Sequence, residues 1–216
     1  MEKILIVGAT GSTGKRIIEI LNNSQSFEPV AMIRKEEQKE IFEDMEVNWV
    51  HADLEQDDFS SALKGIKKVI FCAGSGGDTG PEKTTEVDEK GAIKIIDAAK
   101  KAKVKKFIML SSMGADEPSK HTKLEHYLEA KATADKHLRE SGLDYTIVRP
   151  GALTDDIGTG KVKLAEKLDG SGEIPRDDVA FLLIMSLADP LVKNMTFEAV
   201  EGEEPIKSAM IELSRE

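Results

Sequence analysis

The sequence contains a single cysteine, Cys72, in 216 residues. One thiol cannot form an internal disulfide, and without paired cysteines or histidines at ligand spacing we expect no metal site. Cys72 itself follows an apolar run, so we expect it to be a small core residue and not a nucleophile. His121 and His126 lie in a segment rich in Lys and Glu, and we expect them to be surface histidines of a charged helix.

Long hydrophobic runs and an excess of positive charge are also absent. The first apolar run covers only residues 4–7, which is too short for a secretion signal, and no stretch reaches the length of a membrane span. The chain has 30 Lys and Arg against 40 Asp and Glu, a net charge of −10. Nucleic acids and anionic membranes bind basic faces, so we expect neither as a partner. We expect a cytoplasmic protein, and no sequence feature specifies its oligomeric state.

Apolar runs alternate with helical patterns along the whole chain, which has the length of one domain, 1–216. We expect strands at residues 4–7, 27–33, 47–50, 67–72, 106–110, 144–148 and 195–200. We expect helices after residue 14 and at residues 34–44, 82–103, 120–141, 176–187 and 205–213, with Leu124, Leu128 and Leu138 of the fourth helix facing inward. This order predicts an α/β fold with a doubly wound, mostly parallel sheet, helices on both faces and a small C-terminal extension.

A glycine-rich turn follows the first expected strand. Gly8, Gly11 and Gly14 come at three-residue spacing between the apolar run and a helical pattern. Gly8 allows a tight turn, Gly11 lets main-chain N–H groups approach phosphate oxygens, and Gly14 lets the helix pack on the strand. Free N–H groups at the helix start favour an anion there. We expect a pyrophosphate site at Gly8, Thr10, Gly11, Ser12, Thr13 and Gly14; the alternative is a tight turn without a ligand.

The second expected strand ends in two basic residues, Arg34 and Lys35. In dinucleotide-binding folds, the tip of this strand meets the adenosine ribose, where a carboxylate binds the ribose hydroxyls and an arginine pairs with a 2′-phosphate. No carboxylate appears before Glu36. We therefore expect NADP(H), with NAD(H) as the less favoured cofactor; the alternative is a solvated basic pair that opens a charged helix.

A tyrosine and a lysine, Tyr127 and Lys131, lie four residues apart in an expected helix and so share one face. A lysine cation beside a phenol stabilises the phenolate, which makes the pair suited to proton transfer in carbonyl reduction. Ser111 and Ser112 end the fifth strand at the edge where a substrate carbonyl would lie. The alternatives are a polar strand end for the serines and a packed helix residue for Tyr127.

Six segments occur in the order of the short-chain dehydrogenase/reductases, and they cover residues 3–153: Gly8 to Gly14, Ala52-Asp53-Leu54, Cys72-Ala73-Gly74, Ser111-Ser112, Tyr127-x-x-x-Lys131 and Arg149-Pro150-Gly151. The glycine spacing resembles the atypical branch, which includes biliverdin/flavin-reductase-like and NmrA-like NAD(P)-binding Rossmann proteins. The resemblance implies that Asp53 and Leu54 bind the adenine, and that Ala73 and Gly74 pass the adenosine ribose. It also implies that Ser111 lies near the cofactor and that backbone from Pro150 through Gly151 to Leu153 holds the carboxamide. The implied catalytic set is Ser112, which polarises the carbonyl, Tyr127 and Lys131.

The chain departs from that pattern in two ways. Asp88 stands where better-known branches often have an asparagine, and the part after Pro150 is shorter than the substrate domain of nucleotide-sugar epimerases. We therefore expect an NADPH-dependent oxidoreductase that reduces a small carbonyl or quinone-like substrate, with this small molecule as its partner. The alternatives are a non-catalytic NADP(H)-binding sensor or, less favoured, a nucleotide-sugar epimerase or dehydratase. Loops 75–83 and 151–174 leave the carboxyl edge of the sheet and are either substrate-side lids or ordinary surface loops.

Overall fold

The computed structural model describes residues 1–55, 58–76, 80–188 and 190–215, without the side chain of Leu191. Part of the expected loop 75–83, at 77–79, lies outside the described residues. The strands are β1 (Glu2–Val7), β2 (Phe27–Ile33), β3 (Asn48–His51), β4 (Lys68–Phe71), β5 (Lys106–Leu110), β6 (Asp144–Pro150), β7 (Ala152–Thr154), β8 (Lys161–Ala165), β9 (Glu173–Pro175), β10 (Met195–Glu201) and β11 (Glu204–Pro205). The helices are α1 (Ser12–Asn22), α2 (Lys39–Glu43), α3 (Pro81–Thr84), α4 (Ala92–Lys101), α5 (Glu125–Glu140), α6 (Arg176–Ala188) and α7 (Ile206–Leu213), with short 3₁₀ turns η1 (Glu36–Gln38), η3 (Pro118–Lys120) and η4 (Pro190–Val192) and a π-helical segment η2 (Thr85–Gly91).

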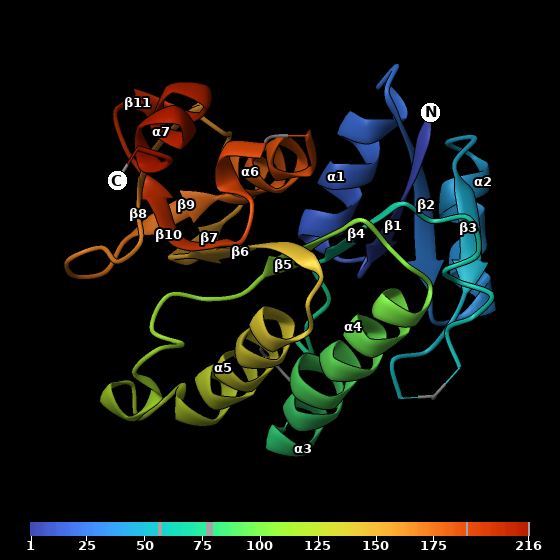
Figure 1. Cartoon of the computed structure of the whole chain (residues 1–216), viewed down its shortest axis with the longest axis horizontal. Helices are drawn as coiled ribbons and strands as arrows, with labels where there is room; N and C mark the ends of the chain where they lie inside the picture. Colours follow the sequence, from blue (N-terminus) through green and yellow to red (C-terminus); the bar gives the residue numbers. More distant parts are fainter. Residues whose placement is uncertain (56–57, 77–79, 189, 216) are drawn as a thin grey trace.

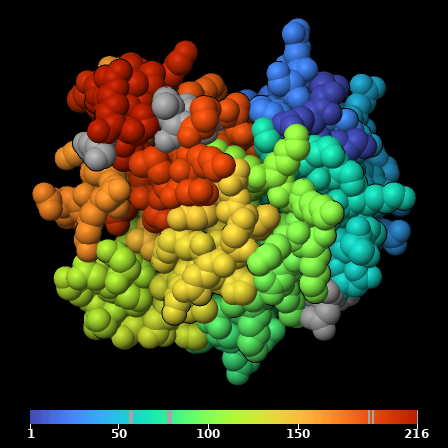
Figure 2. Space-filling view, viewed as in Figure 1, coloured from blue at the N-terminus to red at the C-terminus, as the bar shows by residue number. Residues whose placement is uncertain are grey.

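The described strands form a nine-stranded sheet in the order β11-β8-β10-β6-β5-β4-β1-β2-β3, and β7 pairs with β9 separately. Every pairing from β10 through β3 is parallel, while β8 runs antiparallel to both β10 and β11. This confirms the expected doubly wound, mostly parallel α/β fold. Figure 2 shows the two ends of the sheet order on opposite sides, with cyan residues near 50 on the right and orange and red C-terminal residues on the left.

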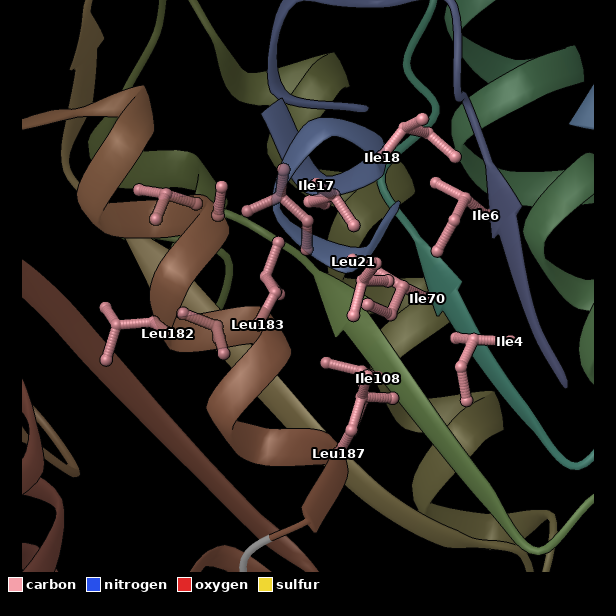
Figure 3. Close-up of a cluster of buried hydrophobic side chains, with 14 of the residues drawn as sticks. Ile4, Ile6, Ile17, Ile18, Leu21, Ile70, Ile108, Leu182, Leu183 and Leu187 are labelled. Carbon is pink, nitrogen blue, oxygen red and sulfur yellow. The ribbon is translucent and has the colours of Figure 1, made fainter. Parts of the chain in front are cut away.

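One helical layer, made by α1 and α6, covers one face of the sheet (Figure 1). The two helices pack against each other, and their aliphatic side chains meet those of the central strands (Figure 3). The fully or almost fully buried members include Ile17, Ile18 and Leu21 of α1, Leu182, Leu183 and Leu187 of α6, and Ile4, Ile6, Ile70 and Ile108 of the strands. Burial of each such side chain contributes about 1.5–3 kcal/mol to stability. These contacts hold α1 against the sheet and so determine where its N-terminus lies.

The second layer, made by α4 and α5 with η2, covers the opposite face (Figure 1). Ile95, Ile96 and Ala99 of α4 are fully buried there, as is Leu138 of α5. Continuous apolar strands between two helical layers explain why the strand runs in the sequence do not alternate. The helical layer on this side carries the residues expected to do chemistry.

The expected helix at 82–103 is a run of three segments, because η2 makes π-helical hydrogen bonds between α3 and α4. The expected helix at 120–141 is shorter, because α5 begins only at Glu125 after the 3₁₀ turn η3. Leu124 was expected to face inward, and that is wrong: it precedes the helix and is 56% exposed, while Leu128 one turn later is buried.

Two further segments differ from expectation. The expected helix at 34–44 divides into η1 and α2, and the expected loop at 151–174 contains β7, β8 and the start of β9. The closing helix, expected from residue 205, is α7. Among the described residues, no helix combines the length and apolarity needed to cross a membrane.

Candidate functional site

A cavity of about 760 Å³ opens at the carboxyl ends of β1, β4 and β5, beside α5. This volume is in the range of cofactor and ligand sites. Most of the site residues expected from the sequence line it: Gly8, Thr10, Gly11, Ser12, Thr13, Arg34, Asp53, Leu54, Ala73, Gly74, Ser111, Tyr127, Lys131 and Leu153. Five of the expected residues lie outside the lining: Gly14, Lys35, Ser112, Pro150 and Gly151.

The glycine turn leaves no room for side chains. Gly8 has a φ of +93°, and a Cβ there would lie 2.5 Å from the main-chain nitrogen of Ala73. A Cβ on Gly14 would lie 2.1 Å from the Gly8 carbonyl oxygen, so α1 can pack this close to the turn only with glycine. Gly14 therefore shapes the turn from behind the cavity wall.

The N-terminus of α1 is open toward the cavity. Gly11 is the N-cap, no side chain caps the helix, and its first turn carries no acidic residue. First-turn N–H groups lack intrahelical partners, and the helix dipole favours negative charge beside them. Gly11, Ser12 and Thr13 line the cavity at this point. The glycine cradle and the uncapped helix thus fit the diphosphate of a dinucleotide.

Arg16 fixes the position of α1 relative to α6. Its Nε donates to Asp177 Oδ1 at 2.6 Å, and its Nη1 donates to the Ser12 carbonyl at 2.9 Å. The contact joins residues 161 apart in sequence. The helix start that faces the cavity is therefore held by a charged hydrogen bond in addition to the apolar contacts behind it.

The end of β2 presents Arg34 to the cavity. The side chain is exposed, and its guanidinium has no partner in the described part of the chain. The backbone beside it is ordered: the N–H groups of Arg34 and Lys35 donate to Gln38 Oε1 at 3.1 and 2.9 Å. Lys35 does not line the cavity. Gln38 does, and the sequence did not indicate it.

The segment after β3 brings Asp53 and Leu54 to the same cavity. Asp53 Oδ1 accepts a hydrogen bond from the Glu55 N–H at 3.0 Å, which orders the turn. Leu54 packs on η2 so closely that a Cβ on Gly91 would lie 2.8 Å from the Leu54 Cβ. An apolar surface next to an acidic acceptor is suited to a purine ring.

Lys131 and Asp88 form a buried ion pair in the wall of the cavity. The side chains are 4% and 0% exposed, and Lys131 Nζ lies 2.9 Å from Asp88 Oδ1. Asp88 Oδ2 accepts the main-chain N–H of Ser75 at 2.9 Å, and Nζ donates to the Leu110 carbonyl at 3.4 Å. Burial opposes the charged amine, but Tyr127 and Asp88 outweigh it and hold the pKa of Lys131 above its usual range.

Tyr127 lies one turn before Lys131 on the cavity side of α5. Its side chain is half-buried, and Lys131 Nζ lies 5.6 Å from the ring centroid. The structure thus brings the phenol and the amine together, as the four-residue spacing requires. Tyr127 lines the cavity, so the phenol is accessible to a bound molecule.

Ser111 and Ser112 are placed differently from one another. Ser111 lines the cavity, but its hydroxyl donates to the buried Asp135 Oδ2 at 2.8 Å, and Arg149 Nε donates to the same oxygen at 3.0 Å. Burial raises the pKa of Asp135, although Arg149 and Ser111 act in the opposite direction. The Ser112 hydroxyl donates to the Met113 carbonyl at 3.2 Å and lies outside the lining.

The segment after β6 is tied to neighbouring strands. The Pro150 carbonyl accepts the Met113 N–H at 2.9 Å, and the Gly151 N–H donates to the Ala199 carbonyl at 2.9 Å. These two residues therefore support the cavity from behind, and Leu153 reaches it. Arg176 contacts the Leu153 carbonyl at 3.4 Å and also lines the cavity, which the sequence did not indicate.

The two histidines and the cysteine for which the sequence predicted no catalytic role are His121, His126 and Cys72. His126 is exposed; its Nε2 donates to the Pro81 carbonyl at 2.8 Å and so joins α5 to α3. His121 is exposed as well. The Cys72 thiol lies 3.3 Å from the Val7 carbonyl, and burial raises its pKa to about 12, which agrees with an unreactive packing residue. Sequence reasoning also missed the lining residues Met32, Lys83, Lys123 and Leu124.

The family comparison gives a match over residues 8–190 to a family described as NAD(P)H-binding. An uncharacterized sugar epimerase, YhfK of Bacillus subtilis (strain 168), is 42% identical over 214 residues, which are 98% of this chain and 100% of the relative. Such a match over nearly the whole of both chains indicates common ancestry and a common fold.

Solved structures of similar proteins have the same fold. A Bacillus halodurans protein with the provisional name NAD-dependent epimerase/dehydratase has a TM-score of 0.94 and 40% identity, covering 99% of this chain and 100% of its own. The oxidoreductase ylbE of Lactococcus lactis has a TM-score of 0.85 and 31% identity, covering 99% and 97%. The anaerobilin reductase ChuY of Escherichia coli O157:H7 has a TM-score of 0.80 at 24% identity, covering 93% and 98%, and so shares the fold.

Proposed function

Because this chain belongs to the NAD(P)H-binding family, with an atypical short-chain dehydrogenase/reductase-like Rossmann fold, we propose that it is an NADPH-dependent oxidoreductase. Its substrate is a small carbonyl or quinone-like compound. The observation that carries this proposal is the pairing of Tyr127 with buried Lys131 in the wall of the same cavity that the glycine turn and Arg34 line. A phenol beside a fixed cation has its use in proton transfer to an oxygen atom.

Bound NADPH supplies a hydride to the substrate. The N-terminus of α1 binds the diphosphate through main-chain N–H groups, and Arg34 pairs with the 2′-phosphate. Asp53 and Leu54 hold the adenine, Ala73 and Gly74 pass its ribose, and the backbone near Leu153 holds the carboxamide. Gln38 orders the backbone at Arg34 and Lys35 by accepting their N–H groups, so it does not occupy the Arg34 guanidinium.

Tyr127 donates its phenol proton to the substrate oxygen, and Lys131 stabilises the resulting phenolate. Lys131 can do so because Asp88 and the Leu110 carbonyl hold its amine in one place. The family resemblance implies Ser112 as the polarising hydroxyl, a role for which this hydroxyl has to leave the Met113 carbonyl and turn into the cavity. The serine that lines the cavity, Ser111, is tied to Asp135 and supports that edge of the site.

Two other functions are less supported. The names of two relatives suggest an epimerase or dehydratase. Beyond β6, however, the described part of this chain adds only β7–β11, α6, α7 and the turn η4, and α6 packs on α1. A sensor that binds NADP(H) without turnover needs no Tyr–Lys pair, so the pair favours catalysis. We place the protein in the cytoplasm, with the small-molecule substrate as its partner.

Tyr127→Phe tests the proposal. The variant removes the proton and leaves the ring, so we expect NADPH to bind with unchanged affinity in calorimetry. NADPH oxidation, followed at 340 nm across a panel of aldehydes, ketones and quinones, should fall by roughly 10²–10⁴-fold, the usual contribution of a general acid. Tyr145→Phe is the matched control, because Tyr145 lies in β6 and outside the cavity lining. Tight NADPH binding without turnover of any compound would instead favour the sensor.

A further inference from the structure

Asp88 is a buried carboxylate for which the reaction described above has no direct use. It lies on η2, is 0% exposed, and does not line the cavity. One oxygen is taken by the Ser75 N–H and the other lies 2.9 Å from Lys131 Nζ. A buried carboxylate is costly unless it is paired, and here its cation is the one that faces Tyr127.

The charged groups around Tyr127 come from several elements. Asp88 comes from η2, Lys131 and Asp135 from α5, and Arg149 from β6, where it pairs with Asp135 at 3.0 Å. The elements that pack around α5 contribute paired charges as well: Asp97 of α4 with His137, Lys83 of α3 with Glu55, and Lys120 of η3 with Glu117. Lys123 and His126 also line the cavity, and both are exposed. The buried charges thus form two pairs, each of which sums to zero.

We propose that Asp88 balances the charge of Lys131 and thereby keeps Tyr127 a neutral phenol, ready to donate its proton at neutral pH. An unbalanced buried cation at 5.6 Å from the ring would favour the phenolate. A phenolate suits an enzyme that oxidises alcohols, whereas a phenol suits one that reduces carbonyls. Asp88 is in this sense a positioning residue, which acts on Tyr127 through Lys131.

The proton balance follows from this arrangement. During reduction, the substrate carbonyl carbon gains a hydride from NADPH, and the carbonyl oxygen gains the phenol proton, so the O–H bond of Tyr127 breaks and that of the product alcohol forms. The phenolate that remains lies beside the Lys131–Asp88 pair until it takes a proton from water. The direction of reaction rests on the proposed function; the electrostatic effect of Asp88 on Tyr127 does not.

Asp88→Asn is the direct test, because asparagine keeps the size of the side chain and can still accept the Ser75 N–H. The readout is tyrosinate absorbance at 295 nm during a pH titration of the full chain without substrate. The chain has two tyrosines, and a parallel titration of Tyr127→Phe isolates the contribution of Tyr127. Glu89→Gln is the matched control, since it removes the same charge from the next residue of η2.

We expect the Tyr127 absorbance step to move to lower pH in Asp88→Asn, by about one pH unit or more, which is the size of a neighbouring charge effect. Glu89→Gln should leave it in place. An unchanged or higher midpoint in folded Asp88→Asn would overturn the proposal, because the charge of Asp88 would then not be what keeps Tyr127 protonated.

Asp88→Asn leaves a buried cation unpaired and could prevent folding. In that event Lys131→Met and the double variant Asp88→Asn/Lys131→Met carry the test. Lys131→Met should move the Tyr127 step to higher pH, because Asp88 is then unbalanced, and the double variant should reverse most of that change. Identical midpoints for the two variants would refute an effect of Asp88 on Tyr127. Turnover is not needed for either result, so failure of the proposed function would be seen separately, in the NADPH oxidation assay.

Discussion

Arg34→Ala should separate the two nicotinamide cofactors. The Arg34 side chain is exposed and its guanidinium has no partner among the described residues, so its removal costs no contact of the folded chain. Hydrogen bonds between charged groups contribute about 1.5–3 kcal/mol each, and the exposure of this site places the loss near the lower end. A loss of about 2 kcal/mol is roughly a 30-fold rise in Kd for NADPH. NADH, which lacks the 2′-phosphate, should change by less than about twofold.

The assay is calorimetric titration of both cofactors into wild type, Arg34→Ala and Lys35→Ala. Lys35 is the matched control, because it is the adjacent exposed cation and lies outside the cavity lining. Each substitution removes one positive charge, so a difference between the two variants reports a direct contact between Arg34 and the 2′-phosphate. Equal losses of NADPH and NADH in Arg34→Ala, or an equal NADPH loss in Lys35→Ala, would refute the assignment of the 2′-phosphate to Arg34.

Two further perturbations test the site and its supports. Gly14→Ala places a Cβ 2.1 Å from the Gly8 carbonyl, so we expect a lower melting temperature and at least a tenfold loss of NADPH affinity, whereas Gly80→Ala, where a Cβ meets nothing within 4 Å, should bind normally. Lys120 and Lys167 lower the pKa of Glu117 to about 2 from an ordinary 4.5, so this contribution to stability is present above pH 4.5 and is lost as the pH falls toward 2. Melting temperatures of Glu117→Gln and wild type should therefore differ at pH 7 and converge in acid; a difference that persists at pH 2 would contradict the ion-pair origin.

The glycine turn and the central strands could be predicted from the sequence because their signals are local. Residues 4–7 and 30–33 are buried in the interior of a parallel sheet, and that environment selects continuous apolar runs. The glycines of the turn are required by steric contacts within a dozen residues of chain, apart from the contact of Gly8 with Ala73. A single sequence therefore contains most of the information for this unit.

The C-terminal strands could not be predicted in the same way. β8 is five residues long with exposed lysines on one side, and β11 has two residues, so neither shows a pattern long enough to distinguish it from a loop. Leu124 illustrates the opposite error: its spacing to Leu128 is helical, but the helix begins one residue later. The residues of the π-helical segment η2 are of the same types as those of an ordinary α-helix, so the sequence did not predict it.

The polar contacts of the site are tertiary, which is why the sequence indicated the participants without their partners. Ser111 and Asp135 lie 24 residues apart, and Arg149 joins them only because β5 and β6 are neighbours. Asp88 departs from the family pattern in a way that is visible in the sequence, yet its pairing with Lys131 depends on how η2 packs against α5. Which serine reaches the cavity likewise depends on side-chain direction at the end of β5.

The local charge of the cavity differs from the net charge of −10. Of the cations in its described lining, Lys131, Lys83 and Arg176 are each paired with a carboxylate, which leaves Arg34 and Lys123 as its uncompensated positive charges. The remaining attraction for a diphosphate comes from main-chain N–H groups of α1, which carry no proton that ordinary pH can remove. The contribution of the diphosphate to cofactor binding should therefore be nearly insensitive to pH, whereas the reaction is not. Proton transfer is assigned to Tyr127, which faces the substrate in front of the Lys131–Asp88 pair, so the main-chain groups that hold the diphosphate are separate from the group that moves a proton.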